Sequence, residues 1–198
     1  MKCFFVALAL SVVMCITVQA QDEMRQELSI SYGAVPNSIW MDAISDLFSG
    51  LAGKSATQDK HFGPLGVEYF CHTSSLVGVG AVAVIHTSSE DYCRNNQLDN
   101  HSFKGYYTLM PAVKFNWLRK EHWGMYNKIA LGATYAHGTT QDYNDNGVKS
   151  GEVKTEDSVL FNFQVSLGVE AGKNHMWGFT EVGIGEQGIA MLGVRYKF

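Results

Sequence analysis

The 198-residue sequence predicts an all-β protein, an eight-stranded antiparallel transmembrane β-barrel with one short helix in the first extracellular loop. Residues 189–198 alternate apolar and polar side chains and end on Phe198. The free edge of such a strand would promote aggregation in water, whereas a closed barrel pairs the edge and turns the apolar face toward lipid. Seven earlier segments also read as strands, and most of them share this period of two, whereas 76–86 is Gly-rich and apolar on both faces. The mean hydropathy of −0.06 also fits, because half of each barrel strand is polar.

The N-terminus has the organisation of a secretory signal peptide. Lys2 supplies a basic start, residues 3–18 are almost entirely apolar, and Ala20 ends a small-residue cleavage site. An N-terminal membrane anchor is the alternative, but the apolar run is short and is interrupted by Ser11 and Thr17. We therefore expect Sec-type export to the outer membrane, with a cleaved signal peptide over 1–20 and a barrel domain over 21–198.

Alternation of apolar and polar residues places each strand in turn. Their polar faces hold small residues with few charges, while their apolar faces carry large aromatic side chains. A soluble lipocalin-like barrel would place apolar residues inside and polar ones outside, so this composition favours lipid around the barrel. The eight strands are expected at 28–35, 65–72, 76–86, 103–117, 123–136, 159–170, 176–185 and 189–198.

The stretch from Asn37 to Gly53 is the only segment after the signal peptide whose pattern clearly predicts a helix. Asn37 can cap its N-terminus, Gly53 can end it, and apolar residues recur along one face. It follows the first strand, which places it in the first extracellular loop. There it can cap the lumen, lie at the membrane interface with Trp40 and Phe48 among the headgroups, or present a binding face to a partner, and the first two are favoured.

Two long polar stretches, from Thr87 to Ser102 and from His137 to Asp157, are expected to be loops. They lie at the same barrel end as the helical connection, and the short turns over 73–75, 118–122 and 171–174 lie at the other end. Long extracellular loops and short periplasmic turns are typical of outer-membrane barrels. Both termini are then periplasmic, and the long loops are the place where an extracellular ligand would bind.

The seventh strand has an awkward phase. Trp177 and Phe179 share a face with Glu181, and we expect a β-bulge near Thr180 to resolve the conflict. Aromatic residues gather at the interfaces of membrane barrels. The girdle on the short-turn side is expected to contain Trp117, Trp123 and Trp177.

Three segments carry a resemblance to a known family: the signal peptide that ends in Ala20-Gln21, residues 107–117 (YTLMPAVKFNW), and residues 179–185 (FTEVGIG) leading to 193–198 (GVRYKF). They resemble the small outer-membrane β-barrels of Bacteroidetes-type bacteria, in the broad class of OmpX and the OmpA transmembrane domain. The resemblance implies no common catalytic residues. It also implies that the barrel-assembly machinery reads the terminal strand, through Phe198, Tyr196, Val194 and Leu192.

Charged residues on the inward faces predict a paired network inside the barrel. An eight-stranded barrel is just wide enough for side chains to fill it, and unpaired charge there would be costly. The network is therefore expected to be a structural plug, and a gated polar path for small solutes is the alternative. Its predicted members are three acids and three bases: Glu68, Glu170, Glu181, Lys114, Lys128 and Arg195.

An enzyme is a second alternative. His86-Thr87-Ser88 resembles the His-x-Ser pair of outer-membrane lipid A deacylases, in which the histidine acts as a base for the serine. The same pattern of residue types recurs at His72-Thr73-Ser74, at the opposite end of the predicted barrel. Because the pattern recurs regardless of position, we favour a lipid-modifying enzyme less than a protein without catalysis.

The segment from Asp142 to Gly147 matches the first half of a calcium-binding loop. Asp142, Asn144 and Asn146 would be ligands, but the closing carboxylate Glu152 comes one residue early and no helices flank the segment. A surface loop is the favoured interpretation, so no metal and no cofactor are expected.

The sequence thus favours a monomeric outer-membrane barrel with a structural or surface-interaction role. Its expected partners are outer-membrane lipid, the barrel-assembly machinery and an extracellular ligand. The formal net charge of −4 argues against nucleic acid.

Overall fold

The computed structural model describes residues 26–34, 59–94, 97–143 and 149–198. Near the far ends of the long strands, over 59–62, 90–94, 97–101, 142–143 and 149–152, it describes backbone and not side chains. The predicted signal peptide and the predicted helix from Asn37 to Gly53 lie outside the described residues. No helix in the described part of the chain is long and apolar enough to cross a membrane.

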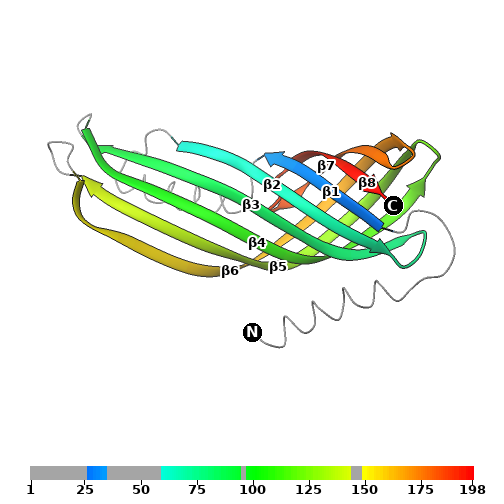
Figure 1. The fold of residues 1–198 in the computed structure, drawn as a ribbon, viewed down its shortest axis with the longest axis horizontal. Helices are drawn as coiled ribbons and strands as arrows, with labels where there is room; N and C mark the ends of the chain where they lie inside the picture. The colour runs from blue at the N-terminus through cyan, green and yellow to red at the C-terminus, as the bar shows by residue number, and fades with distance from the viewer. Residues whose placement is uncertain (1–25, 35–58, 95–96, 144–148) are drawn as a thin grey trace.

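Eight antiparallel strands form a closed barrel, as predicted (Figure 1). Each strand pairs with its neighbours in sequence, and β1 pairs with β8 to close the ring. The strands are β1 (Gln26–Ala34), β2 (Asp59–His72), β3 (Val77–Arg94), β4 (Gln97–Arg119), β5 (Trp123–Tyr143), β6 (Lys149–Lys173), β7 (Met176–Gly185) and β8 (Ala190–Lys197).

Successive side chains alternate between the barrel interior and its outer surface, because a strand has a period of two. In β8, Met191, Arg195 and Lys197 are buried inside, while Leu192 and Val194 are exposed outside. The interior is therefore mostly polar. A small apolar cluster lies along part of the β2–β5 wall: Phe70, Val82, Val84, Met110, Ala112 and Ala130.

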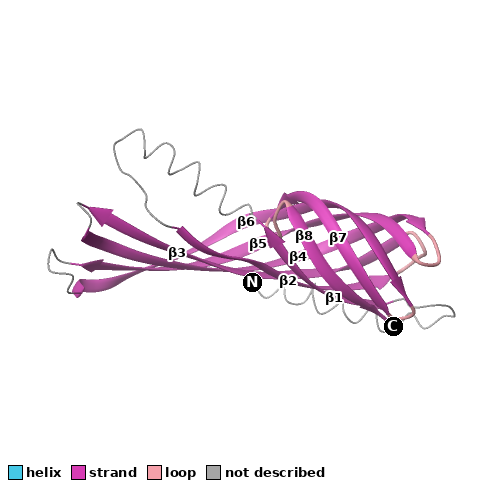
Figure 2. Ribbon diagram, turned by 90° about the horizontal axis from the view of Figure 1, so that it is seen from above, coloured by secondary structure: helices cyan, strands magenta, loops and turns pink. Residues whose placement is uncertain are grey.

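The strands differ greatly in length, which makes the barrel asymmetric. β1 has 9 residues and β8 has 8, whereas β4 has 23 and β6 has 25. β7 pairs with β6 only from Gln164 onward, and β1 reaches β2 only as far as Leu65. The outer parts of β2–β6 consequently continue past the ring as an open, curved sheet, which we call the protruding sheet (Figures 1 and 2).

The prediction of two long loops is wrong. Most of the stretch from Thr87 to Ser102 belongs to β3 and β4, and most of the stretch from His137 to Asp157 belongs to β5 and β6. These residues pair across the strands in a nearly continuous ladder. Where side chains are described at the outer part of β6, residues 153–160 are exposed on both faces, so no apolar and polar alternation marks the strand although it continues.

The predicted bulge near Thr180 is also wrong. β7 pairs with β6 and β8 without any shift in register. Trp177, Phe179 and Glu181 all point inward and are buried. Trp177 therefore does not belong to an outer girdle, whereas Trp117 and Trp123 are 53% and 44% exposed on the outside.

Candidate functional site

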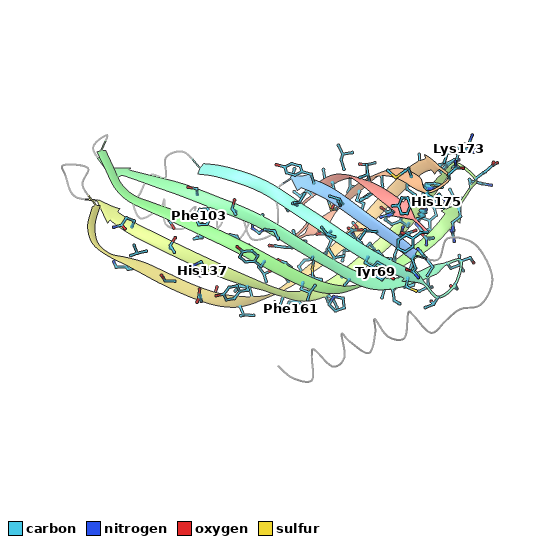
Figure 3. All side chains as sticks on the ribbon, in the orientation of Figure 1. Tyr69, Phe103, His137, Phe161, Lys173 and His175 are labelled. Atoms are coloured by element: carbon cyan, nitrogen blue, oxygen red, sulfur yellow. The ribbon has the colours of Figure 1, made fainter. Side chains whose placement is uncertain are left out.

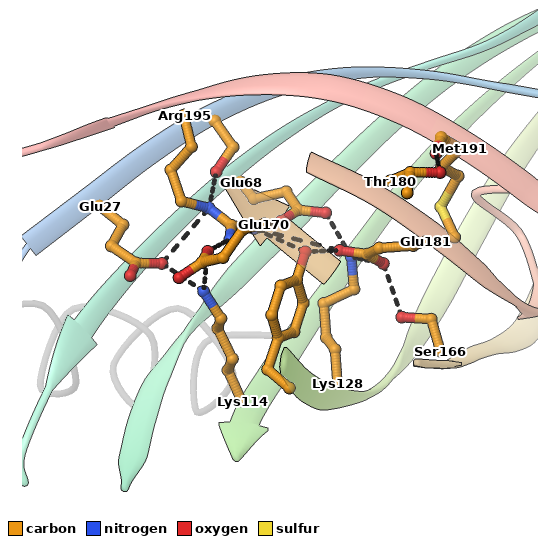
Figure 4. Close-up of polar contacts among 12 residues, drawn as sticks. Glu27, Glu68, Lys114, Lys128, Ser166, Glu170, Thr180, Glu181, Met191 and Arg195 are labelled. Atoms are coloured by element: carbon orange, nitrogen blue, oxygen red, sulfur yellow. Dashed lines mark hydrogen bonds and ion pairs between the residues drawn. The ribbon is translucent and has the colours of Figure 1, made fainter. Parts of the chain in front are cut away.

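The barrel interior holds a dense group of ionisable side chains, which we call the interior charge cluster (Figure 4). Its members come from β1, β2 and β4–β8, so strands far apart in sequence meet across the lumen. None of them is more than 4% exposed. The cluster consists of the acids Glu27, Glu68, Glu170 and Glu181 and the bases Lys114, Lys128, Arg195 and Lys197.

The half of the cluster nearer the termini is centred on Glu27 and Glu170. Lys114 Nζ lies 2.7 Å from Glu27 and 3.3 Å from Glu170. Arg195 pairs with both carboxylates, at 3.3 Å from Glu27 and more closely with Glu170. Lys197 Nζ lies 2.5 Å from Glu170 and 3.6 Å from Glu27. Each carboxylate thus meets three cations, which offsets the cost of burying it.

The other half is centred on Lys128, which pairs with Glu68 and lies 2.7 Å from Glu181. Tyr126 donates a hydrogen bond of 2.7 Å to Glu181. Arg195 reaches this half as well, because it donates a 3.2 Å hydrogen bond to the Tyr126 hydroxyl and lies 3.6 Å from Glu68. Arg195 therefore joins the two halves into one network.

Aromatic rings complete the surroundings of the cations. The Arg195 guanidinium lies 4.3 Å from the centre of the Phe179 ring, and Lys197 Nζ lies 3.9 Å from the Trp177 ring. Lys114 lies 4.1 Å from the ring of Tyr126. Ring faces attract cations most strongly where water is excluded. This explains why the aromatic residues of β7 share the inward face with Glu181, without a bulge.

All six charged residues predicted to face the lumen lie together in the interior charge cluster. Sequence reasoning missed Glu27 and Lys197, which complete it. Glu27 lies just before the predicted start of the first strand, and Lys197 lies on the polar face of the last. Extending the inward phase to both strand ends would have found them, since Glu27 and Lys197 are paired across the β1–β8 seam.

The turn between β7 and β8 enters the barrel above this cluster. Its central residues, Glu186 and Gln187, are 0% and 1% exposed. Asn162 donates a 2.7 Å hydrogen bond to Glu186, and Gln187 donates one of 2.7 Å to Glu68. The sequence predicts only a tight turn here, because the residue types of the turn do not indicate that it faces inward.

The His86 and Ser88 side chains also face the interior. His86 is fully buried, stacks on Tyr106 with ring centres 4.3 Å apart, and lies 3.4 Å from Glu186. Ser88 is 2% exposed. A catalytic pair that acts on membrane lipid must reach the lipid, and these side chains point away from it. Ser74 of the second His-x-Ser pattern lies in the β2–β3 turn, where its hydroxyl accepts hydrogen bonds from Leu76 and Val77.

The calcium candidate cannot be placed as a site. Asn144 and Asn146 lie outside the described residues, and the side chains of Asp142 and Glu152 are not described. Within the described residues, no group of three or more histidine, cysteine or acidic side chains is arranged to hold a metal ion.

The outer surface carries a continuous belt of large apolar side chains from all eight strands, some of which Figure 3 shows. Among them are Ile30, Tyr107, Ile129, Val165 and Val194. A belt to which every strand contributes is unusual on a soluble protein, and this one encloses a charged interior. A polar interior inside an apolar exterior defines a membrane-spanning β-barrel.

The residues predicted as the assembly signal lie on this belt. Leu192, Val194, Tyr196 and Phe198 point outward and are exposed. Phe198 exchanges two backbone hydrogen bonds with Gln26, of 2.9 and 3.0 Å, so the last residue is held at the seam.

Solved structures similar to this chain are those of Ail, the attachment invasion locus protein of Yersinia pestis. One has a TM-score of 0.43 and 15% sequence identity, and a second, in complex with the heparin analogue sucrose octasulfate, has a TM-score of 0.40 and 16% identity. Each match covers 88% of this chain and 100% of the other. No protein-family model and no curated protein sequence matches the chain.

Proposed function

We propose that the protein is an outer-membrane β-barrel that holds a binding sheet outside the cell. The barrel is the anchor and the protruding sheet makes the contacts. The observation that carries this proposal is the edge of β6, which continues beyond the last residue paired with β7. In this proposal the signal peptide directs export, and the terminal strand that ends at Phe198 is read during barrel assembly.

The edge of β6 is suited to bind an extended segment of another protein. In the described part of the chain, no strand pairs with β6 on this side before the β7 ladder begins. Residues 153–161 are exposed, with Val159 71% and Phe161 74% exposed. An unpaired edge offers backbone donors and acceptors to an incoming strand, while neighbouring side chains supply specificity.

The direction of the free backbone groups follows from the hydrogen bonds. The Phe163 carbonyl accepts a hydrogen bond from Glu186 N on the β7 side, 3.1 Å long. Because backbone groups alternate direction along a strand, Thr155, Asp157 and Val159 share that direction. The β5–β6 register is continuous over these residues. Their N–H and C=O groups therefore face the open edge.

The barrel interior favours an anchoring role over the two alternatives, a small-solute channel and a lipid-modifying enzyme. The interior charge cluster and the β7–β8 turn place buried side chains in the lumen, which is unfavourable for a small-solute channel. The inward orientation of His86 and Ser88 is unfavourable for a lipid-modifying enzyme. Replacing Ser88 with alanine is therefore expected to leave lipid A acylation unchanged in cells that make the protein.

The edge hypothesis is tested with Val159→Pro and Val159→Ala. Both variants lose the valine side chain, but only proline removes the N–H that faces the open edge while sparing the β5–β6 ladder. Cells displaying the wild-type barrel would be panned with a phage library of linear peptides. Enrichment on wild type and Val159→Ala, with loss on Val159→Pro, is expected. Equal enrichment on the proline variant would overturn the proposed role of the edge.

A further inference from the structure

The β7–β8 turn is folded into the barrel rather than into solvent, although turns at strand ends are usually exposed. Gly185 and Gly188 flank it with φ angles of 142° and 102°, a region that favours glycine. Between them, Glu186 and Gln187 send their side chains into the lumen. The backbone is thus built to reverse direction inside the ring.

The neighbouring wall, formed by β1 and β2, leaves room for this turn. A Cβ atom on Gly33 of β1 would lie 1.8 Å from the Gln187 carbonyl oxygen, and one on Gly66 of β2 would lie 2.9 Å from Gln187 Nε2. A Cβ atom on Gly33 would overlap the backbone of the turn, so glycine at this position lets the turn approach β1 closely. Gly66 gives the flexible end of the Gln187 side chain room beside β2.

The contacts of the turn cross the seam at which the barrel closes. Ile189 N donates a 2.8 Å hydrogen bond to the Ala34 carbonyl oxygen at the end of β1. The Gln187 side chain passes on to β2, where it donates its 2.7 Å hydrogen bond to Glu68. On the other side, Gln187 N donates a 2.8 Å hydrogen bond to Gln164 of β6. One short turn thus joins the end of the chain to its first two strands.

We propose that the β7–β8 turn is a closure latch. The residues that the turn contacts on β1 and β2 come close to those that it contacts on β6 only after β1 has paired with β8. The turn therefore docks when the ring is closed. Once docked, it holds the extracellular end of the β1–β8 seam, where the ladder is short and lies next to the open edges of the protruding sheet. The latch also couples the seam to the interior charge cluster through Glu68.

The test compares Gln187→Ala with Ser166→Ala in the barrel reconstituted in lipid nanodiscs. Each variant removes one buried hydrogen bond to a carboxylate of the cluster, from Gln187 to Glu68 at 2.7 Å or from Ser166 to Glu181 at 2.6 Å. Only the first belongs to the latch. Hydrogen exchange would be followed at the amides of Ile30, Tyr32 and Ala34, which face β8, and at amides of the β4–β5 ladder.

If the turn is a latch, the amides of the β1–β8 seam should exchange on the order of ten-fold faster in Gln187→Ala than in the wild type, while amides of the β4–β5 ladder should exchange at an unchanged rate. Ser166→Ala should leave the seam unchanged. Gln187→Glu should enlarge the seam effect, because it places a carboxylate against Glu68. If Gln187→Glu fails to fold, the alanine pair still decides the question. Equal exchange at the seam in both alanine variants, or faster exchange spread evenly over the barrel, would overturn the proposal.

Discussion

Arg195 is the side chain on which the barrel interior depends most, because it touches both halves of the interior charge cluster. Removing a buried cation leaves carboxylates unpaired where water cannot solvate them. Arg195→Met retains much of the volume and removes the charge. We expect it to lower the free energy of unfolding by about 3–5 kcal/mol, measured by urea titration in lipid vesicles.

Arg119→Met is the matched control for this prediction. Arg119 lies at the end of β4, is exposed, and donates a hydrogen bond of 3.1 Å to the Ser75 carbonyl oxygen. Its loss should cost less than about 1 kcal/mol, as for other exposed polar contacts. A loss of stability for Arg119→Met as large as that for Arg195→Met would show that the cluster has no special role.

A second residue-scale prediction concerns the exposed pair His137 and Asp157, which are opposite each other on β5 and β6 beyond the apolar belt. His137 Nδ1 lies 2.6 Å from Asp157, and this hydrogen bond is the main cause that lowers the pKa of the Asp157 carboxyl below its ordinary value of 3.8. A lowered pKa means that the pair stabilises the fold above that ordinary value, and that this contribution is lost as pH falls through the folded-state pKa.

His137→Ala is therefore expected to raise the pKa of Asp157 toward its ordinary value. A carbon-detected NMR titration of the carboxyl in nanodiscs measures the change. Thr139→Ala, two residues along the same strand, is the control and should not shift the titration. An unchanged Asp157 titration in His137→Ala would show that the hydrogen bond from His137 is not the cause of the lowered pKa of Asp157.

At the scale of elements, the protruding sheet predicts an alternating pattern of amide protection along β6. Amides of Lys154, Glu156 and Ser158 face β5 and should exchange slowly, while those of Thr155 and Asp157 face the open edge and should exchange fast. Residue-resolved hydrogen exchange in nanodiscs measures both sets. Uniformly fast exchange would indicate a loop, and uniformly slow exchange would indicate an edge that is already covered.

The sequence predicts the strands well where one face meets lipid and the other the lumen. β8 is the clearest example, since Leu192 and Val194 alternate with buried Arg195 and Lys197. The prediction fails for the protruding sheet, where Lys154, Thr155 and Glu156 meet water on both faces and show no period. It fails again at Phe179, because this inward aromatic ring packs against the Arg195 guanidinium, and that pairing comes from a different strand.

At the scale of the whole molecule, the filled lumen predicts a barrel that does not conduct. The interior charge cluster and the inserted turn place buried side chains across the lumen. Wild-type protein in planar lipid bilayers should therefore show no stable conductance steps at moderate voltage. Steps of uniform size in the wild type would instead favour the small-solute channel.

The unequal strand lengths have a mechanical consequence. β3–β6 each run as a single strand from the short turns to the far end of the protruding sheet, so the same four strands belong to both the barrel and the sheet. A force applied to the sheet by a bound partner is directed along these strands. It then loads many backbone hydrogen bonds in parallel, as shear, instead of peeling them apart one at a time. The same geometry that leaves an edge open also makes the sheet a stiff tether.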